Sequence, residues 1–215
     1  MCEVKICGLT NIDDARFAWE SGADYLGFVL YQRSSRSVTE DVLGEILSAL
    51  PGEVRAVGVF VNEKPEEVCR IAGAYGLWAV QLHGEEESGL WQSVPCYVWR
   101  AVRFVGGEPG PDPARWPAER YVVDTSVPGM YGGTGVTGDW AAAAELAGRS
   151  RIMLSGGLRA ENVKVAVEKV MPYGVDVASG VEKAAGIKSH ERVGRFISQA
   201  RAGAAASVPA AGDDR

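Results

Sequence analysis

The chain has 215 residues, 47% of them hydrophobic and 23% charged, which is ordinary for a globular protein with a sizeable apolar core. Its net charge of −6 argues against nucleic acid or an anionic membrane as the main partner. The sequence shows neither a signal-peptide pattern nor an apolar run near the ~20 residues of a membrane span. We therefore expect a cytoplasmic protein. We also expect a small-molecule partner and a monomer or homodimer.

Four cysteines are present, and none belongs to the C-x-x-C pair of a common metal or redox site. A zinc site built from Cys2, Cys7 and either His83 or His190 finds no support in their spacing. No G-x-G-x-x-G dinucleotide fingerprint follows an early strand. The sequence therefore predicts neither a metal nor a cofactor.

Short runs rich in Val, Ile, Leu and aromatic residues alternate with helix-like segments along the chain. Their nearly continuous apolar character is typical of parallel strands covered on both faces. The predicted strands span residues 4–7, 24–30, 54–61, 78–82, 97–104, 120–124, 151–155 and 175–179. The predicted helices span residues 11–21, 39–50, 138–147, 160–170 and 188–202, with another beginning near Asn62, a weaker one at 84–93, and a loop with at most a short helix at 106–118.

This α/β order indicates a single (β/α)8 barrel, or TIM barrel, over residues 1–201. Residues 202–215 are small and polar, and we expect them to form a disordered tail. A doubly wound open sheet is the alternative fold, although such sheets more often carry the glycine fingerprint. In a barrel, catalytic groups lie where the strands end at their carboxyl side.

The first predicted strand ends in a cysteine whose direction follows from strand alternation. Successive side chains point to opposite faces, so Lys5 and Cys7 share one face while Val4 and Ile6 share the other. The apolar pair suits the helix-facing layer, which places Lys5 and Cys7 inside the barrel. Lys5 would lie about 6–7 Å below Cys7 and favour a thiolate there. Asp176 is its expected partner, because the first and last strands of a closed barrel are neighbours.

Glycine-rich ends follow the last two predicted strands, with Gly156 and Gly157 after one and Ser179 and Gly180 after the other. Backbone N–H groups at such ends can bind phosphate, and these two loops are the habitual phosphate site of this barrel. The alternative is that the glycines form ordinary tight turns.

Three further residues have both a chemical and a structural interpretation. Asp124 points inward at a strand end and could act as an acid, or it could cap the next helix. Arg36, in the loop after the second strand, could clamp a carboxylate or phosphate, or it could be a solvated surface charge. His83 could contact a ligand or stabilise a turn.

Several motifs occur in an order that resembles the phosphoribosylanthranilate isomerases of tryptophan biosynthesis. The resemblance runs from residue 3 to about residue 200. It rests on KICGLT (5–10), GVF (58–60), QLHG (81–84), VVDT with YGGTG (122–125 and 131–135), LSGGL with ENV (154–158 and 161–163) and DVASGVE (176–182).

The resemblance implies an Amadori rearrangement of N-(5-phosphoribosyl)anthranilate to the 1-deoxyribulose 5-phosphate derivative, without a cofactor. Asp124 would be the general acid that protonates the ring oxygen, and Cys7 the general base that removes the C2′ proton. Arg36 would hold the anthranilate carboxylate. The phosphate would bind at Gly156, Gly157, Ser179 and Gly180, and the matching motifs add Gln81, His83 and Gly133 as candidate substrate contacts.

The sequence departs from the family pattern in two places. Ser35 stands before Arg36 where the family usually has Pro, which leaves that loop less constrained. Ser189 replaces an Asp before the last helix and can still cap it. Two other interpretations stay open: a dual-substrate isomerase that also serves histidine biosynthesis, with a phosphate site in each half of the barrel, and a barrel kept only as a binding module or scaffold.

Overall fold

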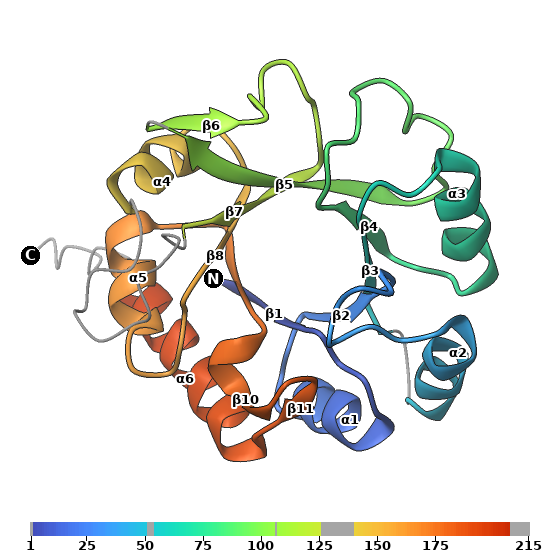
Figure 1. Cartoon of the computed structure of the whole chain (residues 1–215). Coiled ribbons are helices and arrows are strands. Elements are labelled where there is room, and N and C mark those ends of the chain that lie inside the picture. Colours follow the sequence, from blue (N-terminus) through green and yellow to red (C-terminus); the bar gives the residue numbers. More distant parts are fainter. Residues whose placement is uncertain (1, 51–53, 106, 126–139, 207–215) are drawn as a thin grey trace, which may run out of the picture.

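The computed structural model describes residues 2–50, 54–105, 107–125 and 140–206. Eight parallel strands form a ring with helices around it (Figure 1). They are β1 (Glu3–Cys7), β2 (Tyr25–Val29), β3 (Ala56–Phe60), β4 (Ala79–Leu82), β5 (Tyr97–Val105), β7 (Arg120–Asp124), β8 (Ile152–Ser155) and β9 (Gly174–Val177). β1 pairs with both β2 and β9, and the pairing of β4 with β5 closes the ring. The predicted (β/α)8 barrel is confirmed, and the open-sheet alternative is wrong.

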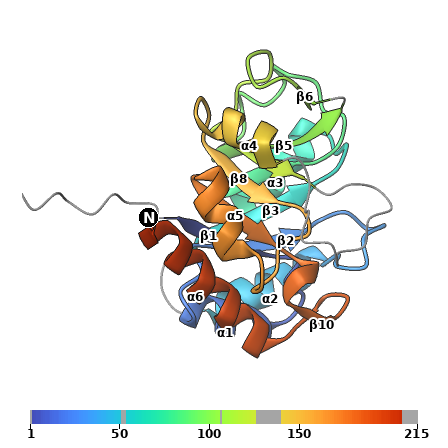
Figure 2. The ribbon, with the colours of Figure 1, turned by 90° about the vertical axis from the view of Figure 1, so that its left-hand side faces the viewer.

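The helices of the described residues lie on the outside of the barrel (Figures 1 and 2). They are α1 (Ile12–Glu20), α2 (Glu40–Ala49), α3 (Pro65–Ala74), α4 (Trp140–Ala147), α5 (Val163–Val170) and α6 (His190–Ala206). Asn11 caps α1 and Thr39 caps α2, each by accepting a hydrogen bond from a first-turn N–H group. Ser189 accepts a bond from Arg192 N at the start of α6, as expected for the residue that replaces the family's Asp.

Residues 84–93 form turns and bends rather than the predicted helix. The Glu86 carboxylate accepts hydrogen bonds from the backbone N–H groups of Asn62 at 2.9 Å and Gly84 at 2.9–3.0 Å. It also pairs with Arg100 on β5 at 2.7 Å. Both side chains are buried, so this ion pair determines the path of the chain and overrides local helix propensity.

Four short elements lie outside the sequence-based prediction. β6 (Glu108–Gly110) pairs antiparallel with β5, and η1 (Ser179–Val181) is a single 3-10 turn after β9. β10 (Glu182–Ala184) and β11 (Ile187–Lys188) form a hairpin beside α1 (Figure 1). Strands of two or three residues are too short to produce a recognisable hydrophobic period.

α6 extends to Ala206, past the predicted domain end at residue 201. Residues 202–206 are therefore helical rather than part of a disordered tail, and residues 207–215 of that predicted tail lie outside the described residues. Alanine, the strongest helix former, is abundant here. Gly203 also packs closely on α5, since a Cβ atom there would lie 2.7 Å from the carbonyl oxygen of Lys164.

The side chains of β1 alternate as predicted. Val4 and Ile6 belong to the core between the barrel and its helices. Lys5 is fully buried on the opposite face, with Nζ 3.0 Å from Asp176 Oδ1 on β9. The predicted contact between Lys5 and Asp176 is confirmed.

Aromatic and charged side chains fill the amino-terminal end of the barrel. Arg120 pairs with Glu3 and lies over the rings of neighbouring aromatic residues. Its guanidinium carbon is 4.9 Å from the ring centroid of Tyr25, 5.1 Å from that of Trp99 and 4.5 Å from that of Tyr173. This packing leaves the opposite, carboxyl-terminal mouth for a ligand, which is where barrels of this type carry their sites.

Lys5→Met and Asp176→Asn should each lower the free energy of unfolding by about 3–5 kcal/mol, because each leaves a buried group without its partner. The double variant should lose less than the sum of the two losses, by about 1 kcal/mol or more. Urea unfolding followed by circular dichroism measures this coupling. The exposed pair Glu67–Arg70 is the control and should show no comparable coupling. Strict additivity at the buried pair would contradict the structure.

Candidate active site

The thiol of Cys7 lies at the carboxyl end of β1 and is almost fully buried. Gly27 on β2 makes room for it, since a Cβ atom there would lie 2.8 Å from Cys7 Sγ and 3.0 Å from Lys5 Cε. Burial lowers the pKa of Lys5, but Asp176 and Cys7 together outweigh burial and raise it. A charged ammonium therefore lies next to the thiol, as strand alternation predicts.

Asp124 ends β7 at the same mouth. It lines a pocket of about 270 Å³ together with the ends of β8 and β9. Arg103, near the end of β5, places Nε 4.0 Å from Asp124 Oδ2. Residues 126–139, which follow the end of β7, lie outside the described residues, so the alternative that Asp124 caps the next helix stays a prediction.

All four predicted phosphate-binding residues line this pocket. Gly156 and Gly157 have φ angles of +91° and +66°, in the left-handed region that favours glycine. A Cβ atom at Gly180 would lie 1.9 Å from the carbonyl oxygen of Leu158, so glycine is required for the two loops to approach. The glycines make tight turns, and the same turns bring two stretches of backbone to one pocket.

Arg36 extends to the mouth from the loop after β2. The carboxylate of Glu182 binds one edge of its guanidinium group. Nε and Nη2 donate to Glu182 Oε1 and Oε2 at 2.8 and 2.7 Å. These bonds raise the pKa of Arg36. Gly8, with φ of +70°, lies against the Arg36 stem, because a Cβ atom there would be 2.7 Å from Arg36 Cδ. The interpretation of Arg36 as a solvated surface charge is therefore wrong.

Gln81 and His83 lie on and just after β4, beside a cation that the sequence interpretation missed. The Gln81 amide nitrogen is 3.1 Å from His83 Nδ1, and Arg103 Nη2 is 3.3 Å from His83 Nε2. Burial, followed by Arg103, lowers the pKa of His83, so the ring is neutral at neutral pH. The Gln81 side-chain oxygen is buried without a hydrogen-bond partner among the described residues. Arg103 lies four residues after Trp99 on β5, so alternation places both side chains on the inner face of the barrel. This alternation could have identified Arg103 from the sequence.

Gly133, the remaining predicted substrate contact, lies outside the described residues, as does the YGGTG motif. Within the part of the chain that the structure describes, no group of His, Cys, Asp or Glu is arranged to hold a metal ion. The helices described there are all too short or too polar to span a bilayer.

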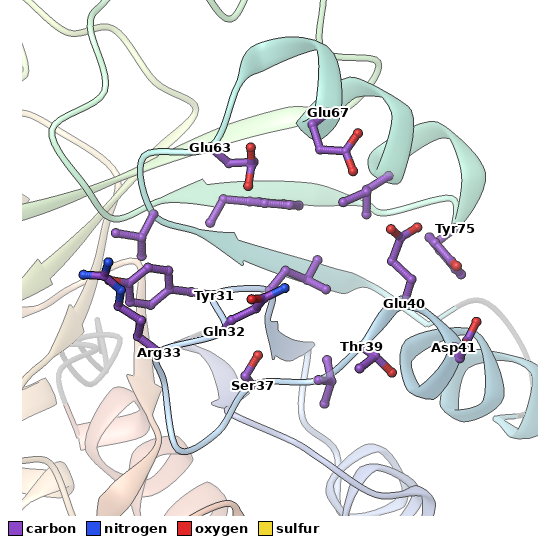
Figure 3. A pocket seen from close by; sticks show the side chains of 15 residues that line it. Tyr31, Gln32, Arg33, Ser37, Thr39, Glu40, Asp41, Glu63, Glu67 and Tyr75 are labelled. Atoms are coloured by element: carbon purple, nitrogen blue, oxygen red, sulfur yellow. The ribbon is translucent and has the colours of Figure 1, made fainter.

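A larger groove, of about 720 Å³, opens between the loop after β2 and α3 (Figure 3). Its lining includes four carboxylates and one cation, namely Glu40, Asp41, Glu63, Glu67 and Arg33. This excess of negative charge disfavours an anionic ligand. The smaller glycine-lined pocket is therefore the better candidate for a phosphate group, although the groove is the larger of the two.

The fold and the strand-end groups together define a class of protein. A closed parallel barrel with reactive side chains and a glycine-lined pocket at its carboxyl-terminal mouth has the architecture of a (β/α)8-barrel enzyme. The family model for N-(5'phosphoribosyl)anthranilate (PRA) isomerase matches residues 4–199. The chain belongs to this family.

Individual relatives agree over nearly the full length. The N-(5'-phosphoribosyl)anthranilate isomerase of Rubrobacter xylanophilus is 44% identical over 211 residues, covering 94% of this chain and 100% of the relative. A crystal structure of phosphoribosyl anthranilate isomerase from Thermotoga maritima matches with a TM-score of 0.82 and 40% identity, covering 94% and 99% of the two chains. Another structure of such an isomerase, in complex with reduced 1-(o-carboxyphenylamino)-1-deoxyribulose 5-phosphate, matches with a TM-score of 0.80 and 38% identity over the same shares.

Titration of the imidazole signals by NMR should place the pKa of His83 below its ordinary value of 6.5. Because Arg103 contributes to this depression, Arg103→Met should move the pKa upward. The chain has only two histidines, so a His190→Gln variant assigns the signals. A His83 pKa above 6.5 in the unaltered protein would contradict the neutral ring.

Proposed function

We propose that this chain converts N-(5′-phosphoribosyl)anthranilate to 1-(2-carboxyphenylamino)-1-deoxyribulose 5-phosphate in tryptophan biosynthesis. The observation that carries the proposal is the order of the strands. β9 and β8 lie between β1 and β7, so Cys7 and Asp124 flank the two glycine-rich loops. A sugar whose phosphate bound to those loops would have the thiol on one side and the carboxyl group on the other. Family membership supports this substrate.

The chemistry needs one proton donor and one proton acceptor. Asp124 would protonate the ribose ring oxygen, so that the C1′–O bond breaks and a Schiff base forms with the anthranilate nitrogen. Cys7 would remove the C2′ proton, and the resulting enol would tautomerise to the ketone. Each proton transfer contributes about 10²–10⁴-fold to the rate. Substrate and product are isomers, so no redox cofactor is required.

Cations around Cys7 support its role as a base. Lys5, Arg36 and Lys188 each interact electrostatically with Cys7. Burial and the neighbouring carboxylates have larger effects on the pKa values of these three cations. The three cations therefore place positive charge around the thiol. A thiolate is the form of cysteine that can accept a proton.

The remaining contacts follow from the two ends of the substrate. The phosphate would bind to backbone N–H groups of Gly156, Gly157, Ser179 and Gly180. Arg36 would hold the anthranilate carboxylate. Gln81, whose side-chain oxygen has no hydrogen-bond partner in the described part of the chain, and the neutral His83 would contact the substrate between these ends. The contact assigned to Gly133 stays a prediction.

The location and assembly expected from the sequence also stay predictions. We propose that the enzyme acts in the cytoplasm, where a phosphorylated intermediate is retained. A relative from Thermotoga maritima, 40% identical to this chain, is described as dimeric, which is compatible with the expected monomer or homodimer.

Cys7→Ala and Asp124→Asn should each lower kcat by about 10²–10⁴-fold, because each removes one proton transfer. Turnover is measured by fluorescence with the substrate generated in situ. Cys69→Ala, which alters a partly exposed cysteine on α3, is the matched control and should keep normal turnover. If both site variants kept near-normal kcat, the assigned acid and base would be wrong.

A further inference from the structure

The Glu182 carboxylate joins two loops that are far apart in the sequence. It is buried, and both of its oxygens accept hydrogen bonds from the Arg36 guanidinium, 146 residues earlier in the chain. Arg36 is the more exposed partner, with 28% of its side chain accessible against 5% for Glu182. The buried carboxylate is therefore the fixed member of the pair, and it determines where the guanidinium lies.

Glu182 is itself anchored by donors other than Arg36. Lys188 Nζ donates to Glu182 Oε1 at 2.9 Å and to the carbonyl oxygen of Ala178 at 3.2 Å. The backbone N–H group of Gly186 donates to the same carboxylate oxygen at 3.2 Å. The Lys188 side chain is fully buried. Burial raises the pKa of Glu182, but the hydrogen bonds and charges of Arg36 and Lys188 outweigh burial and lower it, so the carboxylate is charged at neutral pH.

The β10–β11 hairpin that carries these groups also contacts the loops on either side of Arg36. Thr10 Oγ1 donates to the carbonyl oxygen of Gly186 at 2.6 Å. A Cβ atom at Gly186 would lie 3.4 Å from the carbonyl oxygen of Ser35. The hairpin therefore lies against the segment that carries Arg36.

The guanidinium group of Arg36 has a second edge, formed by Nη1 and Nη2. The bonds of the first edge to Glu182 determine where this second edge lies. Arginine has five N–H donors, arranged to bind carboxylates in pairs. Glu182 uses Nε and one N–H of Nη2, so Nη1 and the outer N–H of Nη2 have no partner among the described residues. These two donors point away from Glu182 and form an edge that can bind one further carboxylate.

We propose that Glu182 is a positioning residue, anchored by Lys188, that presents the outer edge of Arg36 to the carboxylate of the anthranilate ring; this rests on the proposed function. Glu182 acts through Arg36 and does not touch the reacting atoms. It thereby makes the enzyme selective for a substrate that carries this carboxylate.

The test compares two ligands by titration calorimetry. One is reduced 1-(2-carboxyphenylamino)-1-deoxyribulose 5-phosphate, and the other is the same compound without the ring carboxyl group. The unaltered protein should bind the carboxylated ligand more tightly. Glu182→Gln should reduce this preference by about 10-fold or more, because only the carboxylated ligand uses the positioned edge. In turnover, the same variant should raise KM more than it lowers kcat.

Two variants separate positioning from a loss of structure. Lys188→Met keeps the Glu182 carboxylate but removes its anchor, and it should reduce the preference in the same direction to a smaller extent. Glu86→Gln breaks another buried glutamate–arginine pair, with Arg100, and is the matched control. It should lower stability while the preference between the ligands stays unchanged.

Each outcome decides between the alternatives. The positioning role would be overturned if Glu182→Gln weakened the binding of both ligands equally. It would also be overturned if neither Glu182→Gln nor Lys188→Met changed the preference between the ligands. Absence of isomerase turnover in the unaltered protein would overturn the proposed function, and it is measured without any variant. Normal turnover with no preference between the ligands would leave the reaction standing and refute the use of Arg36 as the carboxylate site.

Discussion

The barrel depends on a positive charge that cannot reach solvent. The Lys5 side chain is fully buried, and its Nζ lies 3.0 Å from Asp176. An ammonium buried here without a partner would lower the stability of the fold by roughly several kcal/mol, so a carboxylate must lie beside it. Because the two residues belong to the first and last strands of the barrel, the ion pair joins the amino-terminal and carboxyl-terminal parts of the chain where the ring closes. Cys7 follows Lys5 on β1, and the glycine loop follows Asp176 at the end of β9, so both come next toward the carboxyl-terminal mouth.

Strand alternation and the closure of the barrel made part of the structure predictable, including the contact between Lys5 and Asp176, whereas the contacts made by irregular segments were not predictable. Strand alternation predicted the inward direction of Lys5 because a period of two is visible in five residues. The helix expected at 84–93 is absent because Glu86 pairs with Arg100 on the following strand. Nothing in the sequence around Arg36 indicated Glu182, which is 146 residues away. The residues at the strand ends could thus be located from the sequence, whereas contacts such as that of Arg36 with Glu182 required coordinates.

Local and overall charge differ sharply in this protein. The chain carries a net charge of −6, and the large groove beside α3 follows that sign. At the mouth, in contrast, Lys5, Arg36 and Lys188 all interact with the Cys7 thiol. A substrate with both a phosphate and a carboxylate would meet these three cations at the mouth. An acidic protein can therefore bind an anion, provided that its cations are gathered in one place.

The Glu86 carboxylate has a consequence for the symmetry of the barrel. Asn62 and Gly84 follow the third and fourth barrel strands, and the glycine loops follow the seventh and eighth, half a turn around the ring. In the first half, backbone N–H groups converge on the carboxylate of Glu86, a permanent part of the chain. If the glycine loops bind phosphate as proposed, the two halves provide comparable anion sites, one occupied by Glu86 and one open to a ligand. A substrate with a phosphate at each end would find one of these two sites already filled.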